Sequence, residues 1–416
     1  MIAWHEARAK VLGACAALPP ASVRLGDARG SVVADAVTAR EQVPPFDNTA
    51  MDGFAVRAAD TVHAPVELEV VGTLAAGAAP SVPVGAGEAV RIMTGAPMPQ
   101  GADAVVMVER TTAVGDGRVR IEVAAEPGDH IRPAGDDLEP GHVVVAPGAV
   151  LGAAHLGVLA SVGVTDVTVY PRVRVGVMST GDELVQGAAL LRPGQIRDSN
   201  RPVLLALVAE AGCVPVDLGS IRDDEGSISA AIESGVARCD AILTSGGVSM
   251  GDFDYVKVVL DRVSDDMEWM QIAIKPAKPL AFGTIRAGDR RVPVFGLPGN
   301  PVSSMVSFEL FARPALRQMM GHPVLDRPTV SAVADDGFPR RPDGKTHFVR
   351  VAARFEPDGR CHVRSSGGQG SHQLAAMAAA NALVVLPDGD GVGPGAAVQA
   401  MLLTEPVTGG VAPLGG

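Results

Sequence analysis

Cysteine is scarce in this 416-residue chain, and its few copies lie far apart. Cys15, Cys213, Cys239 and Cys361 form no CxxC pair, so the sequence predicts neither a disulfide framework nor a zinc knuckle. Isolated thiols are typical of proteins in a reducing compartment, and we therefore expect a cytoplasmic protein.

Long hydrophobic runs are also missing. A membrane-spanning helix needs about 18 uncharged apolar residues in succession, and no such run occurs. Near the N-terminus, Glu6, Arg8 and Lys10 fall where a signal peptide would have its apolar core. We therefore expect neither membrane association nor export.

Basic residues do not dominate the composition. The net charge of −12 and the isoelectric point near 5.2 argue against nucleic acid as a partner, so a basic cluster is expected to be local and specific. The motifs HExxH, GxSxG and GxxxxGKS/T are absent too. These absences argue against histidine-zinc chemistry, serine hydrolysis and Walker-type use of ATP.

A length of 416 residues predicts two to four domains, because one domain takes roughly 100–200 residues. Residues 4–17 are expected to form an alanine-rich helix and residues 31–38 a short strand. The same order of helix and strand returns later in the chain. Its predicted elements are a strand at Val143–Val145, a helix over 153–161 and a strand over 164–169.

The segment between these elements has a different composition. It is rich in β-branched residues, glycine and proline, with short alternating runs such as Val66–Val70. We therefore predict a split N-terminal domain formed by residues 1–43 and 141–170, with an inserted β-rich domain over residues 44–140.

From residue 171 to residue 321, predicted strands and helices alternate, which is typical of a parallel α/β sheet. The predicted elements are Val173–Val177, Pro202–Ala211, Val214–Leu218, Ile228–Ala237 and Ile242–Thr244. After Pro328 the periodicity changes to two, with hairpin signals at Pro342–Gly344 and Pro357–Gly359. Residues 322–416 are therefore expected to form a small β domain.

The most informative stretch is Ser245–Asp254, which follows a predicted buried strand. Its glycines bring backbone N–H groups close to a phosphate, because no Cβ atom blocks the approach. Asp252 and Asp254 add hard oxygen ligands for a magnesium ion beside that phosphate. A plain glycine turn is the alternative interpretation.

Two more unusual loops follow predicted strands, and ligands of such sheets bind at the carboxyl ends of strands. Ser179–Leu184 contains two adjacent carboxylates, and a helix cap is the alternative there. Gly296–Pro301 ends with Asn300 as a helix-cap candidate and Pro301 at the first helical position. All three loops are expected at one crevice.

Numbered along the chain, the first loop is Ser179–Leu184, the second Ser245–Asp254 and the third Gly296–Pro301. Two lysines lie between the second and the third. Lys275 and Lys278 flank a proline and are expected in an extended turn, where a fixed pair of cations suits an oxyanion; solvated surface lysines are the alternative. Two more loops, 44–53 and 92–97, hold more polar residues than packing requires. Asp52 precedes a glycine there, so a simple Asx-turn is also open.

Together these segments resemble the molybdopterin molybdenumtransferase family, that is, the bacterial MoeA type and the E domain of gephyrin. The resemblance covers nearly the whole chain and rests on six motifs in the same order. They are PFDNTAMDGFAVR (45–57), IMTGAPMPQGADAVV (92–106), STGDEL (179–184), TSGGVSMGDFDYV (244–256), IKPAKP (274–279) and GLPGNPVSS (296–304).

The resemblance implies a multidomain α/β fold. Its parts are a molybdopterin-binding α/β three-layer domain with a parallel sheet, a split N-terminal domain with a β-rich insertion, and a C-terminal β-barrel. It also implies a transferase that inserts molybdenum from molybdate into adenylylated molybdopterin and releases AMP with the help of Mg²⁺. Tungstate is a similar oxyanion, and the sequence does not choose between the two metals.

Carried over residue by residue, the resemblance assigns roles on this chain. Catalytic groups are expected at Asp52, Thr94, Asp137, Glu183, Asp223, Asp254, Lys275 and Lys278. Pterin, adenylate or molybdate is expected to contact Ser179, Thr180, Gly181, Asp182, Ser245, Gly246, Gly247, Val248, Ser249, Lys275, Lys278, Pro298, Gly299, Asn300, Ser304, Arg350 and Ser371. Metal-facing carboxylates are expected at Asp182, Glu183 and Asp254.

The resemblance further implies a homodimer, in which the inserted domain reaches the α/β domain of the other subunit. Phe54 replaces a tyrosine frequent in the family, which is a conservative change. A fused adenylyltransferase domain of the gephyrin kind is missing, so a separate molybdopterin adenylyltransferase is the expected pathway partner. The alternatives are a pterin adenylyltransferase and a scaffold that has lost catalysis.

Overall fold

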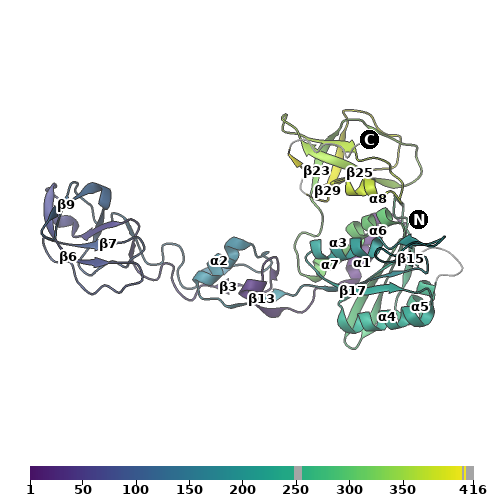
Figure 1. Ribbon diagram of the computed structural model, residues 1–416, viewed down its shortest axis with the longest axis horizontal. Helices are drawn as coiled ribbons and strands as arrows, with labels where there is room; N and C mark the ends of the chain where they lie inside the picture. The colour runs from purple at the N-terminus through teal and green to yellow at the C-terminus, as the bar shows by residue number, and fades with distance from the viewer. Residues whose placement is uncertain (248–254, 405–406, 409–416) are drawn as a thin grey trace. The chain divides into compact units, whose positions relative to one another are not determined.

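The computed structural model describes residues 1–247, 255–404 and 407–408, which form two compact units (Figure 1). Unit 1 consists of Met1–Ala21, Gly30–Ala34 and Val169–Gly416. Unit 2 consists of Ser22–Arg29 and Asp35–Thr168. The domain boundaries expected from the sequence stay predictions.

Within the described residues, unit 1 contains a six-stranded sheet in the order β17-β14-β18-β22-β21-β19. Its strands are β14 (Arg174–Thr180), β17 (Val214–Ile221), β18 (Ala241–Ser245), β19 (Glu268–Gln271), β21 (Pro279–Ala287) and β22 (Arg290–Leu297). The pairs from β17 to β22 are parallel, as predicted, whereas β21 and β19 pair antiparallel. The reason is that only Gly288 and Asp289 join β21 to β22, and a two-residue turn is too short for a parallel crossover.

Helices cover both faces of this sheet (Figure 1). They are α1 (Trp4–Ala14), α3 (Asn200–Glu210), α4 (Glu225–Arg238), α5 (Tyr255–Val263), α6 (Pro301–Ser307), the π-helical turn η4 (Phe308–Ala312) and α7 (Arg313–Met319). Neighbouring side chains of a strand point to opposite faces, so Val177 lies in the core with α1, α3, α6 and α7, and Met178 in the core with α4 and α5. The predicted three-layer α/β fold is confirmed.

The C-terminal part of unit 1 is a closed barrel. Strands β25 (Thr346–Phe355), β26 (Cys361–Ser365), β23 (Thr329–Ala334), β29 (Ala397–Leu402) and β27 (Ala382–Leu386) pair in this order, and β27 pairs again with β25. Val351, Val363 and Val384 are fully buried in its core. The barrel predicted from the family resemblance is therefore confirmed.

Short elements accompany the barrel and the sheet. They are β15 (Leu184–Val185), β16 (Ile196–Arg197), β20 (Ile274–Lys275), β24 (Phe338–Pro339), β28 (Gly391–Val392), β30 (Val407–Thr408) and α8 (Leu374–Ala378). The hairpin predicted at Pro357–Gly359 is confirmed, because β25 and β26 pair across it. The hairpin predicted at Pro342–Gly344 is wrong, because β24 before it pairs with β28 and not with β25.

Unit 2 is rich in strands, as predicted for residues 44–140. Its main sheet has the order β8-β5-β7-β6-β10-β9 in the described part of the chain. The strands are β5 (Gly53–Val56), β6 (Val66–Leu74), β7 (Glu88–Ile92), β8 (Ala104–Met107), β9 (Thr111–Gly115) and β10 (Arg118–Ile121). Val105 and Val106 lie in separate apolar clusters, so both faces of β8 are covered.

Shorter elements complete the first 170 residues. They are η1 (Leu25–Asp27), η2 (Ala58–Asp60), η3 (Val108–Arg110), β1 (Ala21–Arg24), β2 (Val32–Val33), β3 (Val37–Thr38), β4 (Asn48–Thr49), β11 (Ile131–Arg132), β12 (Val143–Val145), α2 (Ala153–Ser161) and β13 (Asp166–Tyr170). The helix at 153–161 and the strand at 143–145 are confirmed. The single strand predicted over 31–38 is wrong, because β2 pairs with β13 and β3 with β12.

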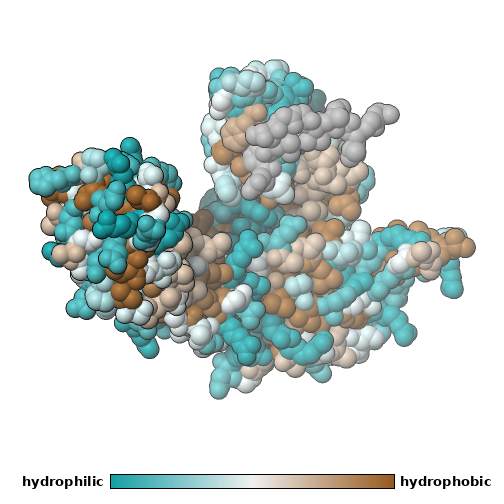
Figure 2. All heavy atoms as spheres, turned by 60° about the vertical axis from the view of Figure 1, so that its left-hand side comes forward, coloured by the Kyte–Doolittle hydropathy of each residue, from teal (hydrophilic) through white to brown (hydrophobic). Residues whose placement is uncertain are grey.

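No helix in the described residues is both long and apolar enough to cross a lipid bilayer. On the face drawn in Figure 2, hydrophilic and hydrophobic residues are interspersed in small groups. Exposed apolar side chains include Leu190, Val62 and Val324. Scattered exposure of this kind is ordinary for a folded chain.

Candidate functional site

The first loop, predicted over Ser179–Leu184, begins two residues later than the sequence suggests. Ser179 and Thr180 are the last residues of β14 and are buried, whereas the sequence placed them in a turn. The alternative of a helix cap is wrong as well, because the next element is the strand β15. The hydroxyl of Ser179 donates to Oδ2 of Asp198 at 2.6 Å, and its proton is therefore already bound to a carboxylate.

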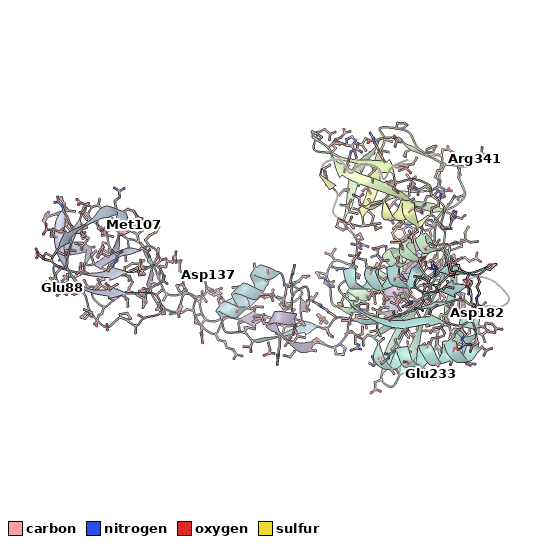
Figure 3. All side chains as sticks on the ribbon, in the orientation of Figure 1. Glu88, Met107, Asp137, Asp182, Glu233 and Arg341 are labelled. Atoms are coloured by element: carbon pink, nitrogen blue, oxygen red, sulfur yellow. The ribbon has the colours of Figure 1, made fainter. Side chains whose placement is uncertain are left out.

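Two exposed carboxylates follow this strand. Asp182 and Glu183 lie in the turn between β14 and β15 (Asp182 is labelled in Figure 3). Oδ1 of Asp182 accepts a hydrogen bond from the backbone N–H of Asp223 at 3.3 Å. The structure therefore brings together two of the acidic groups named from the sequence, Asp182 and Asp223.

Asp223 lies next to the start of α4 but does not cap this helix. The cap of α4 is Asp224, whose carboxylate accepts hydrogen bonds from the N–H and the hydroxyl of Ser227. These hydrogen bonds hold the pKa of Asp224 below its ordinary value. Asp223 lies one residue before the cap, and the capping hydrogen bonds are made by Asp224.

The three predicted loops begin at one edge of the sheet. In the strand register, Ser179 is opposite Ser245, and Ser245 is opposite Leu297. The backbone N–H of Gly246 donates to the carbonyl of Leu297 at 3.2 Å, which joins the second loop to the third. The three loops therefore begin at the carboxyl ends of neighbouring strands, and the expectation that they form one crevice stays a prediction.

Gly246 fits this position because it has no side chain. Its φ is +97°, in the left-handed region, and a Cβ atom there would lie 3.0 Å from the carbonyl oxygen of Thr180. Real Cβ atoms rarely approach a backbone oxygen so closely. The backbone of the second loop therefore passes the first loop at a distance that glycine alone permits.

We expect Gly246→Ala to lower the free energy of unfolding by about 2 kcal/mol, because it combines an unfavourable φ with a backbone clash. Gly194→Ala is the matched control, since Gly194 has a φ of +86° but open space around its missing Cβ. It should cost about 1 kcal/mol. Urea unfolding measures both, and equal losses would show that the clash is unimportant.

The third loop leads into α6. Pro298 is buried, whereas Gly299 and Asn300 are exposed. Asn300 occupies the cap position and Pro301 the first turn, as predicted, but the Asn300 side chain makes no capping hydrogen bond. The amide of Asn300 is therefore not required by the helix.

Inside α6, Ser304 is buried, and its hydroxyl has no hydrogen-bond partner among the described residues. The backbone N–H of Val302 donates to the carbonyl of Ser371 at 3.1 Å. This contact places Ser371, from the barrel part of the chain, beside the start of α6. Two residues far apart in the sequence that were both expected in the site, Ser304 and Ser371, thus belong to the same neighbourhood.

The lysine loop is closed by a backbone hydrogen bond from the N–H of Ile272 to the carbonyl of Lys278, at 2.7 Å. Lys275 ends the short strand β20 and pairs with His347 of β25. Both lysines are exposed. The predicted extended turn is confirmed, with the addition that Lys275 is tied to the edge of the barrel.

A cavity of about 600 Å³ opens beside Lys275. Its polar lining includes Arg341 (labelled in Figure 3), His347, Ser365 and Gln369. Burial lowers the pKa of His347, against the raising effect of its hydrogen bond to Asp343. The lining holds three permanently basic side chains, Lys275, Arg340 and Arg341, and one carboxylate, Asp343, so positive charge is in excess.

Next to this cavity, the side chain of Arg350 is fully buried on β25. Its Nη2 donates to the carbonyls of Gly368 and Gly370 at 2.5 and 3.2 Å, and Gln369 holds its backbone N–H at 3.0 Å. Nε and Nη1 are buried and have no hydrogen-bond partner in the described residues. Burial lowers the pKa of Arg350, but a guanidinium stays protonated at neutral pH.

Unit 2 holds a separate pair of predicted residues. Oδ1 of Asp52 accepts hydrogen bonds from the backbone N–H and the hydroxyl of Thr94, at 2.6 and 2.7 Å. These bonds, with a contribution from Arg91, lower the pKa of Asp52. Asp52 is therefore a carboxylate at neutral pH, and any stability that it contributes is lost only as the pH falls through this lowered pKa.

Three further expectations have different outcomes. Asp137 (labelled in Figure 3) is exposed in unit 2, and its backbone N–H donates to the carbonyl of Val43 at 2.9 Å. Val248, Ser249, Asp252 and Asp254 lie outside the described residues. Among the residues that the structure describes, no cluster of three or more metal-ligating side chains occurs.

Sequence reasoning missed two residues at this edge of the sheet. Asp198 contacts Ser179 from the turn that leads into α3, and Asn200, the first residue of α3, contacts Ser245. The signal was present as the run Arg197-Asp198-Ser199-Asn200 before an apolar helix. Such polar residues were unremarkable because the start of a helix favours Asp, Ser and Asn for capping alone.

Family models match three stretches of the chain. Residues 2–163 match the MoeA N-terminal region (domain I and II), residues 176–318 a probable molybdopterin binding domain, and residues 332–403 the MoeA C-terminal region (domain IV). Curated relatives match most of the length of the chain. A molybdopterin molybdenumtransferase of Haemophilus influenzae is 38% identical over 88% of this chain and 89% of its own length.

This chain belongs to the molybdopterin molybdenumtransferase family. A second relative, molybdopterin molybdenumtransferase 2 of Mycobacterium tuberculosis, is 40% identical over 91% of this chain and 93% of its own length. Among solved structures, a molybdopterin biosynthesis MoeA protein from Pyrococcus horikosii has a TM-score of 0.78 and 31% identity, covering 97% of this chain and all of that one. The family resemblance stated from the sequence motifs is confirmed.

Proposed function

We propose that this chain inserts molybdenum from molybdate into adenylylated molybdopterin and releases AMP. The observation that carries the proposal is Arg350, a buried guanidinium with two N–H-bearing nitrogens that lack partners in the described residues. Such an arrangement is costly unless an anion satisfies these donors. Molybdate is a tetrahedral oxyanion whose oxygens suit them.

The cationic and hydroxyl groups around Arg350 support the same assignment. Lys275 borders the adjoining cavity, Lys278 closes the same loop, and Ser371 lies beside α6. Lysine supplies charge without a fixed direction, whereas arginine supplies a rigid fork of donors. We assign molybdate to this group of residues.

The glycine-rich loops suit the phosphate end of the substrate. Gly246 and Gly247 both have positive φ values, and Gly299 is exposed. Loops of this kind expose backbone N–H groups to an anion, although the N–H of Gly246 itself already donates to the carbonyl of Leu297. We assign the phosphates that join pterin and adenylate to Ser245–Gly247 and Pro298–Asn300.

The carboxylates of Asp182 and Glu183 fit Mg²⁺. They are adjacent and exposed at the same edge of the sheet, and carboxylate oxygens are the ligands that this ion prefers. Mg²⁺ is commonly held by one or two carboxylates, with substrate phosphates and water completing its shell. When bound, it would offset the negative charge that AMP carries as it leaves.

We also propose a homodimer and a separate molybdopterin adenylyltransferase as its pathway partner. Family membership supports both proposals, and the scattered reduced cysteines support a cytoplasmic location. All four cysteine side chains are buried, and burial raises the pKa of Cys15 and Cys213 to about 12. Such thiols are poorly reactive.

The testing experiment measures cofactor formation and AMP release by the purified chain with adenylylated molybdopterin, molybdate and Mg²⁺. We expect omission of Mg²⁺ to slow both by about tenfold or more. Asp182→Asn should raise the Mg²⁺ concentration needed for half-maximal rate by about tenfold, since it removes one anionic ligand. Lys275→Ala should lower the rate at limiting molybdate.

Glu233→Gln is the matched control for charge. Glu233 is an exposed acid on α4 (labelled in Figure 3) and hydrogen-bonds only to Ser229 among the described side chains. Its loss should leave the Mg²⁺ dependence unchanged. ATP-dependent transfer of AMP onto molybdopterin by this chain alone would contradict the proposal and favour an adenylyltransferase.

A further inference from the structure

The turn before α3 contacts the ends of several strands of the sheet. Asp198 accepts hydrogen bonds from the hydroxyl of Ser179 at 2.6 Å and from Nε of Arg201 at 3.1 Å. Arg201 in turn forms an ion pair with Asp217 of β17. The side chain of Asp198 is nearly inaccessible to solvent, so the turn is firmly anchored on β14 and β17.

Asn200, the first residue of α3, makes two further contacts at this edge of the sheet. Its Nδ2 donates to Oγ of Ser245 at 2.7 Å and to the carbonyl of Gly299 at 2.6 Å. A carbonyl oxygen only accepts, so the amide nitrogen of Asn200 must face Gly299. One side chain therefore links the end of β18 to the loop that follows β22.

This geometry determines whether the Ser245 hydroxyl accepts or donates its hydrogen bonds. Ser245 accepts from Asn200, so its own proton is available for another acceptor. Ser179 differs, because its proton is donated to the carboxylate of Asp198. Of the two serines at this edge, Ser245 is therefore the one whose hydroxyl proton is not given to Asp198.

The amide oxygen of Asn200 shows that packing alone does not explain why asparagine occupies this position. Its Oδ1 is buried and has no hydrogen-bond partner in the described part of the chain. An amide oxygen buried in this way costs free energy that an apolar side chain would avoid. The donor side of the amide is therefore what the position requires.

We infer that Asn200 is a positioning residue, which orients the Ser245 hydroxyl toward the substrate phosphate and joins the two glycine-rich loops around it. The inference rests on the proposed function, because that proposal assigns the phosphate to these loops. It adds a residue and a direction of hydrogen bonding to the site.

The test uses AMP and adenosine as probes, because they differ only in the phosphate. Isothermal titration of the full chain should show that Asn200→Ala weakens AMP binding about tenfold and leaves adenosine binding unchanged. Asn200→Asp should weaken AMP binding further, since a carboxylate would face both the Gly299 carbonyl and the phosphate. Ser199→Ala is the matched control in the same turn, since its side chain makes no capping hydrogen bond.

A double-mutant cycle separates positioning from stability. If Asn200 acts through Ser245, Asn200→Ala combined with Ser245→Ala should weaken AMP binding no more than Ser245→Ala alone. Multiplied losses, or an equal loss of AMP and adenosine binding, would overturn the inference and leave the proposed function intact. A wild-type chain that binds neither AMP nor adenylylated molybdopterin would overturn both.

Discussion

Arg350→Gln is expected to lower molybdate-dependent cofactor formation by about 100-fold, the usual order for losing a preorganised donor to a reacting anion. Glutamine keeps polar atoms in the buried site but removes the charge and the fork of N–H groups. The apparent KM for molybdate should rise, while AMP binding stays within about twofold, because AMP is assigned to the loops at the end of the sheet. Initial rates over a series of molybdate concentrations measure the effect.

Two variants control for folding. Arg354 lies on the same strand, β25, but its guanidinium is paired with Asp335 and Glu356. Arg354→Gln should therefore affect stability more than the molybdate KM. Arg350→Lys keeps the charge without the fork and should recover part of the activity. A folded Arg350→Gln chain with an ordinary molybdate KM would contradict the assignment of molybdate to Arg350.

Mixing two inactive variants is expected to restore activity if the proposed dimer shares its sites. Asp52→Ala removes the carboxylate that Thr94 holds in unit 2, and Lys275→Ala removes a cation of unit 1. The family resemblance implies that the inserted domain of one subunit completes the site of the other. A mixed dimer would then contain one site with both residues intact.

The size of the recovery follows from counting. With free exchange in an equal mixture, half of the dimers are mixed and each has one intact site, so about a quarter of wild-type activity should return. Asp52→Ala mixed with Thr94→Ala is the control, because both changes are in unit 2 and every site stays defective. Activity in neither mixture, with exchange demonstrated by differently tagged chains, would show that each chain carries its own complete site.

Much of the fold was predictable from local signals. The strand and helix alternation after residue 171, the short strand at Val143–Val145 and the helix at 153–161 all follow from periodicity and turn residues. The predicted ends were less accurate. β14 continues through Ser179 and Thr180, because pairing with β17 up to Ile221 extends a strand that its polar residues alone would have ended.

The single strand predicted over residues 31–38 failed for a related reason. Its valines satisfy a strand pattern, but Val32–Val33 and Val37–Thr38 pair with different partners, β13 and β12. Likewise, Pro342–Gly344 has the composition of a hairpin turn, yet the strand before it pairs with β28. Strand partners are selected by contacts far away in the sequence, and no local pattern contains them.

The sequence by itself determined the family and the transferase chemistry that the family carries, and it named most of the residues that we propose for the site. It did so because glycines, carboxylates and lysines at fixed spacing are constrained by the chemistry of phosphate and oxyanion binding. Only the tertiary structure decided which groups are already engaged. Ser179 donates a hydrogen bond to Asp198, and Ser245 accepts one from Asn200. Arg350 is buried, and its Nε and Nη1 have no hydrogen-bond partner in the described residues. Hydrogen bonds between distant segments set these states, because a donor or acceptor is available only when no neighbour in the fold has taken it.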